Sequence, residues 1–152
     1  MTPSGESELL RAFRQAFEEA NGFWNTGNMK RAYAALPDQL EYRLSPIWPE
    51  ARVLRSRDEV IAFFENFHAT FPDARTTPHE YIEADEGTVI VGSQVTGTGR
   101  SSGAGAAMEI WQVWRVRTSD EAPIVLSVIE FNDRQEAMES AGMREAGARG
   151  TL

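Results

Sequence analysis

The two histidines of this chain are the residues best suited to metal binding and to proton transfer near neutral pH. His68 and His79 are eleven residues apart, on different predicted elements. This spacing does not match a pair of metal ligands, so we expect no metal at either histidine. His68 flanks an apolar stripe that includes Phe64, and we expect it to lean over the mouth of a pocket. The absence of cysteine excludes disulfides, thiolate metal sites and a thiol nucleophile.

Carboxylates near the C-terminus are the next candidates for acid–base chemistry. Asp133 stands where a helix is predicted to begin, a position at which Asp commonly caps backbone N–H groups. If Ile129, Phe131 and Asp133 face the interior of the fold, Glu130 faces the other way. We therefore predict that Glu130 faces solvent on the outer side of the sheet, unless a one-residue bulge reverses the alternation. The same ambiguity applies to Glu109, which also lies within a predicted strand.

Gln112 is a polar residue on an otherwise apolar strand face, which it shares with Ile110 and Trp114. This pattern predicts that the face points into the fold, where the amide would orient a ligand or satisfy a neighbouring polar group. Tyr42 alternates with apolar residues of the first predicted strand. It is interpreted either as a phenolic donor or as a core aromatic residue with a hydrated hydroxyl.

Three helices are predicted in the first half of the chain. Apolar residues recur at helical spacing over residues 9–24, and residues 29–36 form a short second helix between a Gly–Asn turn and Pro37. A third helix follows the capping-box sequence that begins at Ser56 and ends before Pro72. Its phenylalanine stripe needs a large apolar partner, which a sheet would supply.

Alternation and turn residues predict five strands and one closing helix, and the length of the chain predicts a single domain over residues 1–152. Short links make the later strands antiparallel neighbours. The tail after the last helix is predicted to be frayed. The predicted strands are residues 40–44, 79–84, 88–98, 107–117 and 124–131, and the helix is about 133–141.

Composition limits the partners. The 152 residues are 41% apolar and carry a net charge of -8, so phosphate backbones and anionic membranes are repelled and nucleic acid is not expected. No apolar run approaches ~20 residues, and the N-terminus shows no signal peptide. We expect a cytoplasmic protein that does not enter a membrane.

Short motifs occur in a definite order along residues 7–143, and together they resemble the SnoaL-like branch of the nuclear transport factor two-like superfamily. The resemblance implies an α+β fold of the cystatin-like type, with a curved antiparallel sheet wrapped around N-terminal helices as a cone with an internal pocket. It further implies a short helix that closes the cone, no cofactor and a homodimer through the outer sheet face, across which Glu130 would pair instead of facing solvent. The motifs are Asp85-Glu86-Gly87 before Thr88-Val89-Ile90-Val91, Gly99-Arg100-Ser101-Ser102-Gly103, Val113-Trp114, Phe131-Asn132-Asp133-Arg134-Gln135-Glu136-Ala137 and Ala141-Gly142.

The resemblance also bears on chemistry. In SnoaL-like polyketide cyclases an aspartate nine residues before a glycine acts as acid/base in ring closure, and Asp133 and Gly142 keep that spacing. Gln112 falls where related steroid isomerases place a protonated aspartate, but an amide cannot exchange a proton in that way. The first predicted strand ends without the aspartate that serves as base in those isomerases.

Two functions therefore remain open. The favoured one is binding of a hydrophobic or aromatic small molecule in the cone. The alternative is a cofactor-independent polyketide cyclase, isomerase or hydratase that uses Asp133 as acid/base. The residues expected to line the ligand-binding pocket are Gln112, Trp114, Tyr42, His68, Phe64 and Trp24.

Overall fold

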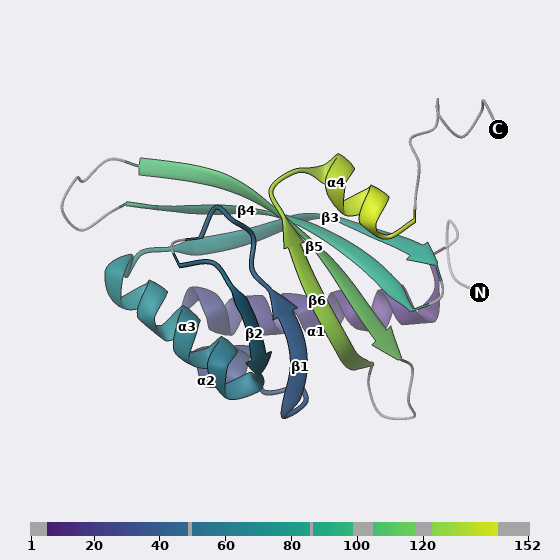
Figure 1. Cartoon of the computed structure of the whole chain (residues 1–152), viewed down its shortest axis with the longest axis horizontal. Coiled ribbons are helices and arrows are strands. Elements are labelled where there is room, and N and C mark those ends of the chain that lie inside the picture. The colour runs from purple at the N-terminus through teal and green to yellow at the C-terminus, as the bar shows by residue number, and fades with distance from the viewer. Residues whose placement is uncertain (1–5, 49, 86, 99–104, 118–122, 143–152) are drawn as a thin grey trace.

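The computed structural model describes residues 6–48, 50–85, 87–98, 105–117 and 123–142. Within them four helices and six strands follow one another, and the predicted α+β fold is confirmed (Figure 1). The predicted fraying of residues 144–152 lies outside the described residues.

The three N-terminal helices form where apolar periodicity predicts them, although the N-cap of the first helix, Ser7, was not predicted. Helix α1 spans Glu8–Asn25, and its N-cap Ser7 accepts a hydrogen bond from the Leu10 amide at 3.0 Å. Helix α2 covers only Met29–Ala32 and is shorter than predicted. Helix α3 spans Arg57–Thr70, and Ser56 caps it by accepting from the Glu59 amide at 3.1 Å.

The six strands form one sheet in the order β2-β1-β6-β5-β4-β3. Strands β1 and β6 run parallel, whereas the other neighbours are antiparallel, so the sheet is mixed and not purely antiparallel as expected. The four-residue strand β2 was not predicted, and β3 begins four residues earlier than its predicted start at His79. The strands are β1 Gln39–Arg43, β2 Val53–Ser56, β3 Arg75–Asp85, β4 Thr88–Thr98, β5 Gly105–Arg117 and β6 Ile124–Phe131.

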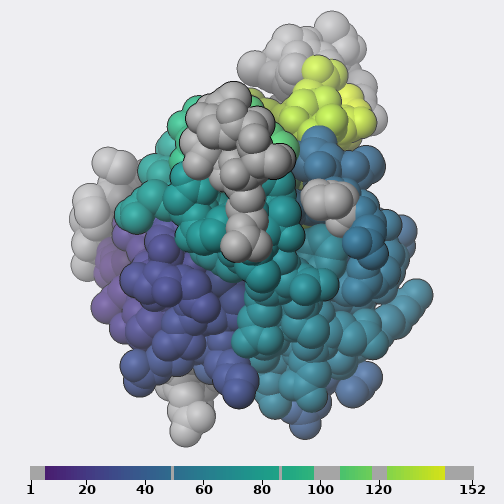
Figure 2. Space-filling view, turned by 90° about the vertical axis from the view of Figure 1, so that its left-hand side faces the viewer, coloured from purple at the N-terminus to yellow at the C-terminus, as the bar shows by residue number. Residues whose placement is uncertain are grey.

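Helices pack on both faces of this sheet. The larger core joins α1, α2 and α3 to the inner face, and Figure 1 shows α1 passing behind the strands. Helix α4, Arg134–Ser140, packs Ala137 and Met138 against Ile90, Trp111 and Val113 on the outer face. The expectation that the last helix closes the cone is therefore wrong, because its apolar side covers the outer face instead. Figure 2 shows α4 in yellow at the top, away from the purple residues of α1.

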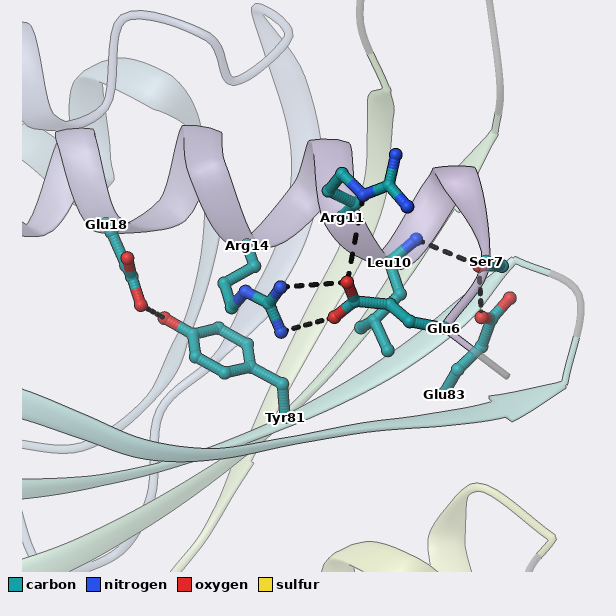
Figure 3. A network of polar contacts seen from close by, with 8 residues as sticks. All are labelled: Glu6, Ser7, Leu10, Arg11, Arg14, Glu18, Tyr81 and Glu83. Carbon is teal, nitrogen blue, oxygen red and sulfur yellow. Dashed lines mark hydrogen bonds and ion pairs between the residues drawn. The ribbon is translucent and has the colours of Figure 1, made fainter. Parts of the chain in front are cut away.

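Polar contacts fix the first half of α1 on strand β3 (Figure 3). The N-cap Ser7 also donates to Glu83, so one hydroxyl both starts the helix and ties it to the sheet. Farther along, Tyr81 donates to Glu18 at 3.3 Å and its ring lies 5.9 Å from that of Phe17. These contacts hold the inner side of α1 over the sheet, where the cavity lies.

Candidate ligand-binding site

A cavity of about 170 Å³ lies between the helices and the inner face of the sheet. Its volume is close to that of an engineered apolar cavity of about 150 Å³ that admits benzene, so the space suits a small molecule. Most of its lining is apolar, and eight of the lining residues are aromatic. We call the following set the aromatic wall: Phe13, Phe17, Trp24, Tyr33, Tyr42, Trp48, Phe64 and Trp114.

Helix α1 supplies one side of the cavity through residues that repeat every three or four positions. Phe13, Phe17, Ala20 and Trp24 all line the space, as expected for one stripe of a helix. Strand β5 supplies the opposite side, and its Trp114 ring lies 5.5 Å from Phe13 and 5.7 Å from Phe17. These edge-to-face contacts are the arrangement that aromatic quadrupoles favour, and they hold the wall in place.

Helix α3 and the segment after β1 complete the aromatic wall. Phe64 stacks on Tyr33 at 5.5 Å and meets Trp48 edge-on at 5.3 Å. Trp24 lies 6.0 Å from Phe64 and links this group to α1. The phenylalanine stripe predicted from α3 thus contributes one ring directly to the cavity.

Glu130 is the carboxylate of the cavity, and it is only 3% exposed. One of its oxygens, Oε1, accepts from the Ser45 amide at 3.1 Å and from the Trp48 indole at 2.7 Å. The other, Oε2, accepts from the Tyr42 hydroxyl at 2.9 Å and from the Gln112 amide at 2.8 Å. We call these five residues the carboxylate cluster.

The placement of Glu130 corrects the prediction that it faces solvent or a dimer partner. Glu130 pairs directly with Gln112 across β5 and β6, so the two side chains share one face of the sheet. A bulge does occur in β6, but it lies before Val128 and leaves the alternation over the last residues of the strand intact. The error was the assumption that Ile129 and Phe131 face the cavity. Phe131 instead packs in the outer-face cluster.

Burial dominates the electrostatics of the carboxylate cluster. It raises the pKa of Glu130, and the hydrogen bonds from Gln112, Ser45, Trp48 and Tyr42 offset only part of that shift. Burial, reinforced by the charge of Glu130, also raises the pKa of Tyr42 well above its usual value. Burial and the charge of Glu130 raise the pKa of Tyr33 as well. Both phenols therefore stay neutral over the whole physiological range.

Gln112 is held in a single orientation by its neighbours. Its Oε1 accepts from the Trp114 indole at 2.9 Å, which directs the amide nitrogen toward Tyr42 and Glu130. Both amide hydrogens then have partners. Of the two roles that the sequence left open, satisfaction of a neighbouring polar group is the one seen here.

Two further polar lining residues, Asn21 and Thr76, form hydrogen bonds with each other and with Asn25. Asn21 and Asn25 each donate to the carbonyl of Thr76 at 3.0 Å, and the Thr76 amide donates back to Asn25 at 2.7 Å. The Thr76 hydroxyl donates to Asn21. This ladder attaches the last turns of α1 to β3.

Five of the six predicted pocket residues line the cavity: Gln112, Trp114, Tyr42, Phe64 and Trp24. His68 is not among the lining residues. Its ring packs 4.5 Å from that of Trp24, its Nε2 is buried without a hydrogen-bond partner, and burial lowers its pKa.

Asp133 lies outside the cavity. It is the N-cap of α4 and accepts from the Glu136 amide at 2.7 Å, and its side chain is exposed. Because α4 packs on the outer face of the sheet, the sheet separates Asp133 from the aromatic wall.

Glu109 is also on the outer face, where its carboxylate lies 3.3 Å from the His79 ring nitrogen. Among the described residues, no group of three or more His, Asp or Glu side chains is placed to hold a metal ion.

Comparison with known proteins identifies the same architecture. A sequence model of the SnoaL-like domain matches residues 11–121. Among curated proteins, none matches the chain significantly. No helix in the described residues is long and apolar enough to cross a membrane.

Solved structures with the same fold differ widely in sequence. A nuclear transport factor two-like protein from Anabaena variabilis has 16% identity and a TM-score of 0.67, with 88% of this chain and 95% of that chain covered. One of unknown function from Burkholderia pseudomallei has 20% identity and a TM-score of 0.64 over 83% and 94% of the two chains. A protein with a ketosteroid isomerase-like fold from Catenulispora acidiphila, solved with trimethylamine, has 12% identity and a TM-score of 0.63 over 95% and 96%. At these identities the likeness shows the fold alone.

Proposed function

Because the chain belongs to the SnoaL-like domain family and its sheet and helices enclose an aromatic cavity, we propose that it binds a small hydrophobic molecule there. The cavity itself carries this proposal. Its walls are apolar and aromatic, with a few polar groups at fixed positions, which is the usual composition of a small-molecule site. A volume of about 170 Å³ limits the ligand to a compact molecule.

Tryptophan fluorescence tests this proposal, because Trp24, Trp48 and Trp114 belong to the aromatic wall. Acetophenone, an aromatic ketone of suitable size, is expected to quench the fluorescence saturably. The variant Ala20→Phe places a ring in the cavity and is expected to weaken quenching by at least about tenfold, because the ligand would have to displace a packed side chain. Ala12→Phe makes the same change on the exposed side of α1 and serves as the control.

Linear, non-saturable quenching that is equal in wild type and in Ala20→Phe would contradict binding in the cavity. A wider panel of neutral aromatic compounds guards against a poor choice of probe. Failure of every compound in such a panel would leave the cavity as packed core without a ligand.

A cyclase, isomerase or hydratase that uses Asp133 remains the alternative from the resemblance, but no contact among the described residues favours it. Asp133 caps a helix on the outer face, and the sheet lies between it and the cavity. Homodimerisation through the outer sheet face and a cytoplasmic location stay predictions. Analytical ultracentrifugation would test the first and fractionation of cells the second.

A further inference from the structure

The charge of Glu130 has no counter-charge at the cavity. Among the described residues that line it, Glu130 is the one carboxylate, and no lysine, arginine or histidine is present. The other polar lining groups near the helices, Asn21 and Thr76, are neutral and bond to each other. A buried carboxylate without a cation is costly in free energy, since protein surroundings stabilise it far less than water does.

The hydrogen bonds around Glu130 suit the ionised carboxylate. Ser45 and Trp48 can only donate through N–H groups, so a proton on Oε1 would confront two donors. At Oε2 the Gln112 amide is also a pure donor, and the Tyr42 hydroxyl that accepts from Gln112 has its own hydrogen free to donate to Glu130. Four donors fill the four acceptor positions of a carboxylate.

The occupied acceptor positions of Glu130 also restrict which kind of cation can bind near it. Since its acceptor positions are occupied, Glu130 has none to offer the three N–H donors of a primary ammonium. Its negative charge still acts over several ångströms, and more strongly in apolar surroundings than in water. A cation without N–H groups would gain this attraction and leave no donor unpaired.

The aromatic wall supplies the other half of such a site. Aromatic faces are electron-rich and attract cations, and quaternary ammonium groups are the ligands most often held this way. Tyr33, Trp24 and Phe64 adjoin one another on the helical side of the cavity, while Glu130 lies on the sheet side. The net charge of -8 would also draw cations toward the protein.

We propose that the ligand of this cavity is a compact organic cation whose methylated ammonium group packs against the aromatic wall and is balanced by Glu130. This inference rests on the proposed small-molecule function and specifies its ligand class. A volume of about 170 Å³ accommodates a trimethylammonium head with a short substituent.

Choline and 3,3-dimethylbutan-1-ol test the proposal on the unmodified protein, because they differ only by N⁺ in place of a carbon atom. Isothermal titration calorimetry should give choline at least about tenfold tighter binding than the neutral alcohol. The alcohol has the lower desolvation cost, so this preference requires a site that favours positive charge. Butylammonium, of similar size but with three N–H donors, should bind more weakly than choline.

Two variants test whether a preference for choline over the neutral alcohol depends on Glu130. Glu130→Gln removes the charge at nearly constant shape, and the ratio of the two affinities should fall to within about twofold of unity. Glu109→Gln removes one charge from the exposed outer face and should leave the ratio unchanged. If Glu130→Gln does not fold, the ratio of the wild-type affinities for choline and for the neutral alcohol still tests whether the cavity prefers a cation.

The outcomes separate the two proposals. Equal or tighter binding of the neutral alcohol overturns the cation inference, as does acetophenone binding without choline binding. Both results leave the small-molecule function standing. If choline, the alcohol and the neutral aromatic panel all fail to bind, the proposed function itself fails, and the cation inference fails with it.

Discussion

The two faces of the central sheet place the same kind of side chain in opposite environments. On the inner face Glu130 is buried among four hydrogen-bond donors without a cation, and burial raises its pKa. On the outer face the Glu80 carboxylate accepts from the Arg134 guanidinium at 3.1 and 2.9 Å, and this hydrogen bonding lowers its pKa. Two glutamates of one sheet thus differ because of their neighbours, and only the inner one can influence a ligand in the cavity.

The largest difference between the faces should appear in stability. Glu130→Leu leaves the donors of Ser45, Trp48, Gln112 and Tyr42 without their acceptor, and we expect a loss of about 3 kcal/mol in the free energy of unfolding. Urea denaturation would measure it. Glu80→Leu breaks only a surface ion pair and should cost less than about 1 kcal/mol. Equal losses for the two variants would remove the distinction between the faces.

A smaller effect is expected from the phenol of the carboxylate cluster. Tyr42→Phe removes one donor to Glu130 and one acceptor for Gln112, at an expected cost of about 1.5 kcal/mol. Tyr81→Phe is the matched control, because its hydroxyl makes one exposed contact, 3.3 Å from Glu18. It should change the unfolding free energy by less than about 0.5 kcal/mol. Chemical denaturation of both variants under identical conditions would measure the two losses in unfolding free energy. An equal loss for Tyr81→Phe and Tyr42→Phe would contradict a special role for the Tyr42 hydroxyl.

Asp133 should behave as a helix cap and nothing more. Asp133→Ala is expected to cost about 1 kcal/mol, whereas Asp133→Asn keeps a capping oxygen and should cost a few tenths. Neither variant should change the affinity of a cavity ligand, since Asp133 lies on the outer face. A loss of ligand affinity in Asp133→Asn would restore a functional role for this residue.

The subtlest effect is the dependence of stability on pH. Because the pKa of Glu130 is raised above its usual 4.5 in the folded state, its contribution to stability is complete below that value and declines as pH rises through the folded pKa. The pKa of Glu80 is lowered, so its contribution is present above 4.5 and is lost as pH falls. The stability of wild type relative to Glu130→Gln should thus fall as pH rises above about 4.5 and through the raised folded pKa of Glu130.

Relative to Glu80→Gln, wild-type stability should rise slightly from acid pH toward 4.5, because the carboxylate is exposed and its ion pair is screened. Urea titrations at a series of pH values would measure both slopes. Slopes of the same sign would contradict opposite pKa shifts on the two faces.

Much of the lining of the cavity was predictable from the sequence. The helical stripe of α1 identified Trp24, the stripe of α3 identified Phe64, and strand alternation identified Tyr42, Gln112 and Trp114. All five line the cavity, because the period of a helix or strand fixes which residues share a face. His68 lies at the edge of its stripe and does not line the cavity, and its ring packs 4.5 Å from that of Trp24.

The sequence by itself determined the helices, most of their caps and half of the aromatic wall, because periodicity and capping depend on neighbours within a few residues. Only the tertiary structure decided the position of Glu130 and the face that α4 covers. Both depend on the register of β6 against β5 and on its parallel pairing with β1, and Glu130 meets Tyr42 across 88 positions of chain. A shift of one residue in that register would exchange the two faces of β6, and no local pattern fixes it.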